Sequence, residues 1–181
     1  ELAFDLRLSR GVGSVSLAAV CRTIPETDPD DPYADYFADL ADRMNDVVVS
    51  GHLVGFIDLV LRIPGDAGPR FLVVDHKSNR LHRLGDPNWS LEYAQAPMRS
   101  AMVHHDYPLQ ALLYTVALHR YLRWRLAGDY DPSMHLAGSA YLFLRGMTGT
   151  VDAAGWSHGV SWWRPTTDAV IAVDRLLAGG T

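Results

Sequence analysis

A single lysine, Lys77, stands among the sixteen basic residues of this chain, and arginine supplies the others. It closes an apolar run that begins at Phe71 and ends in Asp75-His76-Lys77. So strong a preference for arginine indicates that Lys77 fills a position that arginine cannot. A compact ammonium can touch one water or one phosphate oxygen where a planar guanidinium cannot. The alternative is a lysine that persists by chance on the surface.

Two carboxylates accompany this lysine. Asp58 lies within the most apolar run of the chain, residues 53 to 63, where an ionised carboxylate is costly unless it is paired or binds a metal. Alternation along a strand places Asp75 and Lys77 on one face, while His76 points away. Two carboxylates and an ammonium suit a divalent cation and a phosphodiester, because the cation activates water and the ammonium orients that water or neutralises phosphate. The alternative is a structural ion pair between Lys77 and a buried aspartate.

The periodicity of the apolar residues predicts the elements that would carry these side chains. Residues 2 to 8 alternate as a half-buried strand. Residues 23 to 35 are rich in Pro and Asp and predict an exposed acidic loop, followed by a helix over 36 to 44. The runs 53 to 63 and 71 to 74 predict a hairpin that sets Asp58 beside Asp75, with the first strand covered on both faces.

The second half of the chain changes period. Residues 107 to 126 predict a helix, with Pro108 in its first turn. Residues 137 to 145 and a Trp-rich stretch at 160 to 163 predict strands, and the segment after Pro165 predicts a final helix. This order predicts an α/β fold, a mixed central sheet flanked by helices, with no repeat and no second core.

Length and composition favour a single globular domain of 181 residues, 48% hydrophobic and 20% charged. We expect a cytoplasmic protein without a membrane span or signal peptide. The single Cys21 cannot form an intramolecular disulfide, which fits a reducing compartment. The net charge of −5 disfavours a free-standing nucleic-acid binder, yet residues 50 to 127 hold nine basic and six acidic residues.

Three ordered motifs resemble those of the RecB-type nucleases, a branch of the PD-(D/E)xK superfamily. They are Gly55-Phe56-Ile57-Asp58, then Asp75-His76-Lys77-Ser78-Asn79, then Gln110-Ala111-Leu112-Leu113-Tyr114, and the likeness continues through Tyr141 to Gly146 and Arg164-Pro165. The resemblance implies a restriction-endonuclease-like core. It also implies a deoxyribonuclease of the exodeoxyribonuclease V type that uses Mg²⁺, with Mn²⁺ as a substitute and Ca²⁺ as an inhibitor.

The resemblance implies a role for each matched residue. Asp58, Asp75 and the backbone carbonyl of His76 match the metal ligands, and Lys77 matches the catalytic lysine.

Further positions match groups that contact DNA or support the site. Gln110 and Tyr114 lie four residues apart on one helix face, and ordinary helix packing is the alternative reading of this pair. Ser78, Asn79 and Arg145 are candidate DNA contacts.

One departure from the family concerns a histidine that an upstream helix contributes to the metal. No histidine precedes residue 51, and His52 lies six residues before Asp58, about 20 Å away along an extended strand. We therefore expect residues 1–181 to form one nuclease domain that lacks its upstream first helix. The start of the sequence without Met, inside a predicted strand, supports the same expectation.

The other histidines divide into two groups. His104 and His105 precede the helix of Gln110 and could approach the site, whereas His119 and His135 are predicted on a helix surface and at a strand start.

The resemblance also implies partners: DNA, helicase domains of the same polypeptide, RecC-like and RecD-like subunits, and the RecA recombinase, in double-strand break repair. A rival hypothesis is a catalytically silent docking module that recruits a recombinase or partner subunit. Trp124, Trp156, Trp162 and Trp163 are candidates for such an interface, although core packing is expected for most of them. A restriction-type endonuclease is a third hypothesis, which Gln110 and Tyr114 disfavour.

Overall fold

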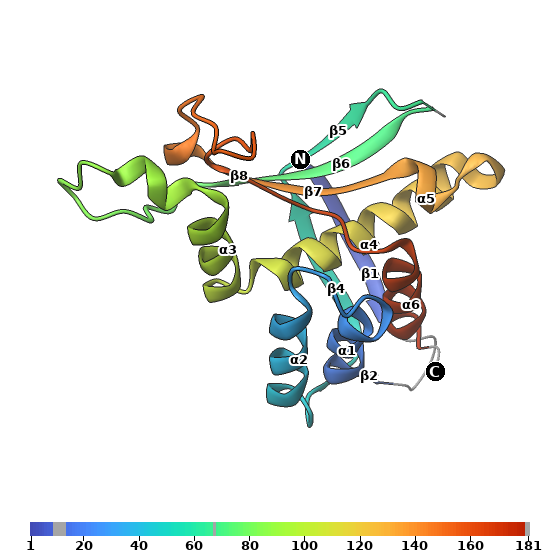
Figure 1. The fold of residues 1–181 in the computed structure, drawn as a ribbon. Helices are drawn as coiled ribbons and strands as arrows, with labels where there is room; N and C mark the ends of the chain where they lie inside the picture. The colour runs from blue at the N-terminus through green and yellow to red at the C-terminus, as the bar shows by residue number, and fades with distance from the viewer. Residues whose placement is uncertain (9–13, 67, 180–181) are drawn as a thin grey trace.

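The computed structural model describes residues 1–8, 14–66 and 68–179 of the chain (Figure 1). In chain order the elements are β1 (Leu2–Leu8), β2 (Val15–Ser16), α1 (Leu17–Thr27), α2 (Ala34–Arg43), β3 (Val48–Val49), β4 (Gly51–Ile57), β5 (Leu59–Ile63), β6 (Arg70–Lys77), η1 (Trp89–Tyr93), α3 (Gln95–His104), α4 (Tyr107–Leu126), η2 (Ala127–Asp129), α5 (Pro132–His135), β7 (Leu136–Phe143), η3 (Leu144–Gly146), β8 (Val160–Trp163) and α6 (Thr167–Leu177).

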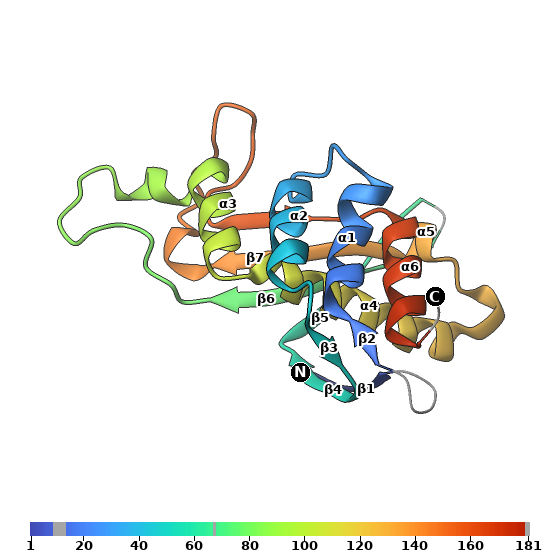
Figure 2. The ribbon, with the colours of Figure 1, turned by 90° about the horizontal axis from the view of Figure 1, so that it is seen from below.

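A four-stranded mixed sheet in the order β5-β6-β7-β8 forms the centre of the molecule. β6 runs parallel to β7, and β5 and β8 are antiparallel edge strands. β1 pairs with β4, and β2 with β3, in separate two-stranded ribbons. The helix α4 lies beneath the sheet in Figure 1. In Figure 2, which is seen from below, α2, α1 and α6 lie side by side in front of the sheet. The predicted α/β fold with a mixed sheet is confirmed.

The long apolar run from 53 to 63 forms parts of two strands, not one. β4 ends at Ile57 and β5 begins at Leu59, so Asp58 occupies the bend between the two ribbons. β4 pairs with β1 and β5 with β6, and each leaves one face toward solvent. The expectation of a strand covered on both faces is therefore wrong, because apolar content does not distinguish a central strand from two edge strands.

The segment predicted as an exposed acidic loop is partly helical. α1 begins at the Ser16 cap, whose side chain accepts the backbone N–H of Ala19 at 3.3 Å, and continues through Pro25 to Thr27. Ile24 is buried in the core, and this packing offsets the helical hydrogen bond that Pro25 cannot donate. The predicted helix after the loop is present as α2, and the predicted hairpin turn includes Ala67, which lies outside the described residues.

Of the four tryptophans weighed for core or interface, only Trp163 is buried. Its ring stacks on Phe37 at a centroid distance of 5.9 Å, and its indole N–H donates to the carboxylate of the buried Asp31 at 2.9 Å. The expectation of core packing is wrong for the other three, which are exposed: Trp124, Trp156 and Trp162.

The helix predicted over 107 to 126 is confirmed at the same bounds as α4. It starts after Asp106, which adopts a left-handed backbone conformation with φ 54°, and Pro108 occupies its first turn. The strand predicted over 137 to 145 ends at Phe143 and continues as a short 3₁₀ turn, while the final strand and helix are confirmed. None of the helices in the described ranges has the length and apolar content needed to cross a membrane.

Candidate active site

Asp58 and Asp75 lie opposite each other at the end of the β5–β6 ladder. The antiparallel register pairs Leu59 with Val74, so Asp58 is the next residue facing Asp75, as the hairpin predicted. The expectation that Asp58 is buried in an apolar strand is wrong, because its side chain at the bend is 46% exposed. Its carboxylate accepts the backbone N–H of His76 at 3.1 Å, which holds the bend against the end of β6.

Asp75 is buried at the end of the central strand β6 and contacts the one lysine. Nζ of Lys77 lies 2.8 Å from Oδ2 of Asp75. The approach is not that of an aligned hydrogen bond, so within the described chain this buried oxygen has a charge contact but no hydrogen-bond donor. Burial raises the pKa of Asp75, Lys77 opposes the shift and the nearby Asp58 adds to it. A positive ion at Oδ2 would favour the charged form.

The ammonium of Lys77 is held from three sides, and its side chain is only 12% exposed. Besides the Asp75 contact, Nζ donates to Oε1 of Gln110 at 3.1 Å. The ring of Tyr107 lies beneath it, 3.9 Å from Nζ to the ring centroid. This distance is that of a cation–π contact. The reading of Lys77 as a chance surface residue is therefore wrong.

Gln110 links the lysine to the helix α4. Its Oε1 also accepts the hydroxyl of Tyr141 at 3.0 Å, and its Nε2 donates to the hydroxyl oxygen of Tyr114, one helical turn away, at 3.1 Å. Burial first, and then the charge of Asp75, raise the pKa of Tyr114. The pair predicted on one helix face is thus connected by polar contacts to Lys77, which packing alone would not require.

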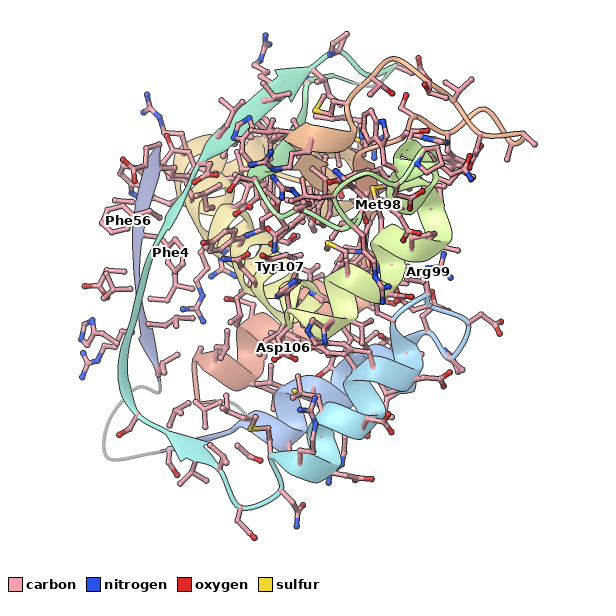
Figure 3. The ribbon with its side chains drawn as sticks, turned by 90° about the vertical axis from the view of Figure 1, so that its left-hand side faces the viewer. Phe4, Phe56, Met98, Arg99, Asp106 and Tyr107 are labelled. Carbon is pink, nitrogen blue, oxygen red and sulfur yellow. The ribbon has the colours of Figure 1, made fainter. Side chains whose placement is uncertain are left out.

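Phe4 is a contributor to this region that the sequence did not single out. Its ring meets Tyr114 edge-on at 5.8 Å, and Gly55 faces it on β4. A Cβ on Gly55 would lie 2.5 Å from the Phe4 ring, so glycine in the Gly-x-x-Asp motif leaves room for it. Figure 3 shows Phe4 and Phe56 on opposite faces of the β1–β4 ribbon. The inward alternation of β1 was the signal that could have found Phe4.

The three candidate DNA contacts lie just beyond Lys77. Arg145 is exposed, and its Nε donates to the backbone oxygen of Ser78 at 2.9 Å. Asn79 turns toward the start of α4. Its Oδ1 accepts the hydroxyl of Tyr107 at 3.2 Å, and its Nδ2 lies 3.3 Å from Nε2 of His105, the residue that caps α3. Asn79 therefore anchors the segment after β6, and Arg145 and Ser78 face solvent.

The histidines near these groups have different positions. The ring of His76 is exposed and lies 3.6 Å from Asp58. His105 approaches the site through Asn79 and stacks on Tyr107 at 5.2 Å, whereas His52 contacts Asp5 at 2.5 Å on the outer ribbon.

The structure tests the positions that the sequence predicted for His119 and His135. The expectation of a surface position is wrong for His119, which is buried on α4 and bonds to the hydroxyl of Tyr130 at 2.8 Å. His135 ends α5 directly before β7, as expected for a strand start.

The donor set fits a hard cation in part. Asp58 and Asp75 supply carboxylate oxygens at facing positions, and Mg²⁺ is commonly held by one or two carboxylates while it keeps several waters. Among the described residues, no group of three or more His, Cys, Asp or Glu side chains could hold a metal ion. The backbone carbonyl of His76 stays a predicted ligand.

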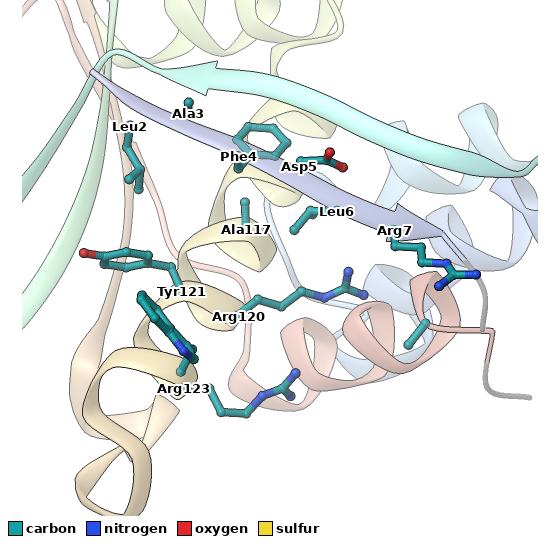
Figure 4. Close-up of a pocket in the computed structure, with 12 residues that line it drawn as sticks. Leu2, Ala3, Phe4, Asp5, Leu6, Arg7, Ala117, Arg120, Tyr121 and Arg123 are labelled. Atoms are coloured by element: carbon teal, nitrogen blue, oxygen red, sulfur yellow. The ribbon is translucent and has the colours of Figure 1, made fainter.

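A cavity of about 740 Å³ lies elsewhere, between β1 and the C-terminal half of α4 (Figure 4). Phe4, Tyr121 and Trp124 line it together with Arg7, Arg120 and Arg123. Its one carboxylate, Asp5, is paired with His52. The convergent acids and the lysine, rather than cavity size, therefore identify the candidate active site.

The chain is similar to RecBCD enzyme subunits RecB. It is 44% identical to that of Mycobacterium tuberculosis over 99% of its own length, 45% identical to that of Escherichia coli over 74%, and 36% identical to that of Haemophilus influenzae over 71%. It spans only 16%, 10% and 9% of the lengths of these three relatives. No protein-family model matches the chain.

Proposed function

Since the chain is homologous to a segment of the RecB subunits of RecBCD enzymes, we propose that it is the nuclease domain of such a subunit and hydrolyses DNA phosphodiester bonds with Mg²⁺. The observation that carries the proposal is the contact of Lys77 with both Asp75 and Gln110 at the point where Asp58 faces Asp75. A structural ion pair would require one acid and one base. It would not require a second, half-exposed carboxylate beside them.

Each side chain has a defined task in this proposal. Asp58 and Asp75 hold the cation, which when bound supplies Lewis acidity and a water of lowered pKa. Lys77 presents its charge to that water or to a phosphate oxygen, and Gln110 and the Tyr107 ring fix its position. Preorganised charge of this kind stabilises a transition state without reorganisation during the reaction.

The names of the relatives support a RecBCD-type complex as the setting of this chain. We propose that helicase domains in the same polypeptide deliver DNA strands, that RecC-like and RecD-like subunits complete the complex, and that RecA receives the product in double-strand break repair. The net charge of −5 is compatible with this arrangement, because other parts of the complex can supply the positive channel.

The first prediction tests the metal carboxylate. Asp75→Ala in the full polypeptide removes a cation ligand, and we expect DNA cleavage with Mg²⁺ to fall by at least about 10². DNA-stimulated ATP hydrolysis and unwinding stay near the wild-type level, because the motor is separate from this site. End-labelled linear DNA reports cleavage, and a coupled assay reports ATP hydrolysis.

The control is Asp39→Ala, an exposed acid on α2, which leaves both activities unchanged. Wild-type protein that unwinds but cleaves no DNA with Mg²⁺ or Mn²⁺ would support the silent docking module instead. A folded Asp75→Ala variant that no longer unwinds would contradict the separation of the two activities.

A further inference from the structure

A second cavity opens directly beyond Lys77. The segment from Ser78 to Asn88 projects away from the end of β6 and leads into η1 (Figure 1). With η3 it borders an open, solvent-facing cavity of about 500 Å³. The residues lining this cavity, which we call the strand pocket, are Arg80, His82, Gly85, Asp86, Trp89 and Arg145.

The strand pocket carries a net positive charge, with two arginines and one aspartate in its lining. Arg80 and Arg145 are exposed, and in the described part of the chain no carboxylate lies within 4.0 Å of either guanidinium. The Nε–H group of Arg145 donates to the backbone oxygen of Ser78, and its remaining N–H groups are available as donors. The one acid, Asp86, accepts the backbone N–H of Asn88 at 2.8 Å and so caps the turn. The pocket therefore favours an anion.

Two aromatic side chains, His82 and Trp89, line the same pocket, and we call them the aromatic wall. The ring centroids of Trp89 and His82 lie 5.4 Å apart, and Trp89 meets Tyr93 edge-on at 6.2 Å. Tyr93 is fully buried, and its hydroxyl accepts the backbone N–H of Leu81 at 3.2 Å. A Cβ on Gly146 would lie 2.3 Å from the Tyr93 ring, so η3 packs tightly on the same support. The wall is thus fixed to the core.

We propose that the strand pocket binds one nucleotide of single-stranded DNA beside the scissile phosphate, with its base against Trp89 and its phosphate between Arg80 and Arg145. This inference rests on the proposed nuclease function. Arg80 lies three positions after Lys77 in the chain, which limits the distance between their Cα atoms to about 11 Å. A nucleotide in the pocket is therefore close enough to belong to the strand that is cut.

The combination of ring and arginine selects an unpaired strand. A base inside a duplex is stacked on its neighbours and cannot reach a side chain without being extruded. Single strands, in contrast, bind to grooves that pair aromatic platforms with cationic side chains, with little dependence on sequence. The nuclease would thus act on strands already separated.

The test measures binding and cleavage of single-stranded oligonucleotides by the full polypeptide. Stacking of one base strengthens binding by a factor of about 5 to 150, so Trp89→Ala should raise KM by that factor with little change in kcat, and Trp89→Phe should restore most of it. Arg80→Ala should reduce the slope of log affinity against log salt by about 0.7, the loss of one phosphate contact on a single strand. Among the described residues, the Arg80 side chain forms no ion pair that its loss could disturb.

Matched controls are Trp124→Ala and Arg125→Ala. Both residues are exposed and lie at the end of α4, whereas Lys77 contacts the start of that helix through Gln110. They should leave KM and the salt slope unchanged. Photo-crosslinking of an oligonucleotide that carries 5-iodouracil, in the inactive Lys77→Gln protein, should label Trp89, and this readout is independent of cleavage.

Unchanged KM in both Trp89→Ala and Arg80→Ala would overturn the inference while leaving the nuclease proposal intact. Full protection of Trp89 from crosslinking by a mononucleotide such as dAMP, at concentrations that do not inhibit cleavage, would overturn it in favour of a free-nucleotide site. Absence of any cleavage by the wild-type protein would instead defeat the nuclease proposal, and crosslinking would still decide whether the pocket binds a strand.

Discussion

Lys77 owes its position to neighbours from two elements. Asp75 comes from its own strand β6, and Tyr107 and Gln110 both come from the start of α4. Each contributes a different interaction: charge, a hydrogen bond and a ring face. The geometry therefore requires a compact cation with several donors. The lysine ammonium is compact, whereas the guanidinium of arginine is a wider, planar group.

The prediction for this position is that Lys77→Arg loses most DNA cleavage, on the order of 10² in kcat. The planar guanidinium cannot occupy the point between Asp75, Gln110 and the Tyr107 ring without displacing one of them. Single-turnover cleavage by the full polypeptide measures the effect. Near-normal cleavage by a folded arginine variant would show that charge alone suffices there.

Tyr107 can be tested separately from the lysine. Tyr107→Leu removes the ring beneath Nζ, and we expect kcat to fall by about 2- to 30-fold, the range of a cation–π contact. Tyr107→Phe keeps the ring, loses only the hydrogen bond to Asn79 and should retain most activity. If the two variants lose kcat equally, the hydroxyl rather than the ring face is what positions the site.

At the scale of elements, the helix α4 connects the site to the rest of the fold. Its first half carries Gln110 and Tyr114, and its second half is tied to α6 by the buried Asp174. Nε of Arg120 and Nη1 of Arg123 both donate to the Asp174 carboxylate, the latter at 2.8 Å. Burial raises the pKa of Asp174, but the two arginines outweigh it and the net shift is downward.

Removing this tie should destabilise the protein strongly. Asp174→Ala leaves the largely buried Arg120 without its partner, which costs about 3 to 5 kcal/mol. Because the pKa of Asp174 is lowered in the folded state, its contribution is complete above its ordinary value of 3.8 and is lost as pH falls through the lowered value.

Urea unfolding of wild type and Asp174→Ala from neutral to acidic pH measures this contribution. The difference between the two should be constant above 3.8 and should shrink below it. The exposed Asp39→Ala serves as the control at each pH. A difference under about 1 kcal/mol at neutral pH would place the Asp174 cluster among ordinary surface pairs.

At the scale of the whole molecule, the sheets bring the two carboxylates together. The β1–β4 ribbon and the four-stranded sheet meet at the bend of Asp58, and the central strand β6 presents Asp75 and Lys77 there. Only these two carboxylates converge on this point among the described residues. The chain spans 16% of the length of its Mycobacterium tuberculosis relative.

Metal titration tests this reading of the whole chain. We expect Mn²⁺ to bind residues 1–181 more weakly than it binds the full polypeptide, because two carboxylates and a carbonyl leave a hard ion mostly to water. Since burial raises the pKa of Asp75 and metal binding requires the ionised form, affinity should increase as pH rises above 3.8.

Isothermal titration calorimetry provides the comparison, with Asp58→Ala as the variant that should lower affinity in both proteins. Equal and tight binding by the two proteins would show that residues 1–181 already contain the complete site. An affinity that does not change with pH would argue against Asp75 as a ligand.

Several features followed from the sequence alone. The long apolar pattern after Asp106, with Pro108 in its first turn, predicted α4 at 107 to 126, and the Trp-rich stretch predicted the strand at 160 to 163. The single lysine and the spacing of Asp58, Asp75 and Gln110 indicated the candidate site, since their chemistry does not depend on knowing how the strands are covered.

Other features depended on the tertiary structure. The break of the apolar run at Asp58, the burial of His119 and the exposure of Trp124, whose side chain is 74% exposed, each reflect which neighbours pack against a segment, and a local pattern does not contain that information. The ring of Tyr107 beneath Lys77 and the strand pocket around Trp89 likewise join residues from separate elements. Residue types thus defined the available chemistry, and long-range packing decided which groups meet.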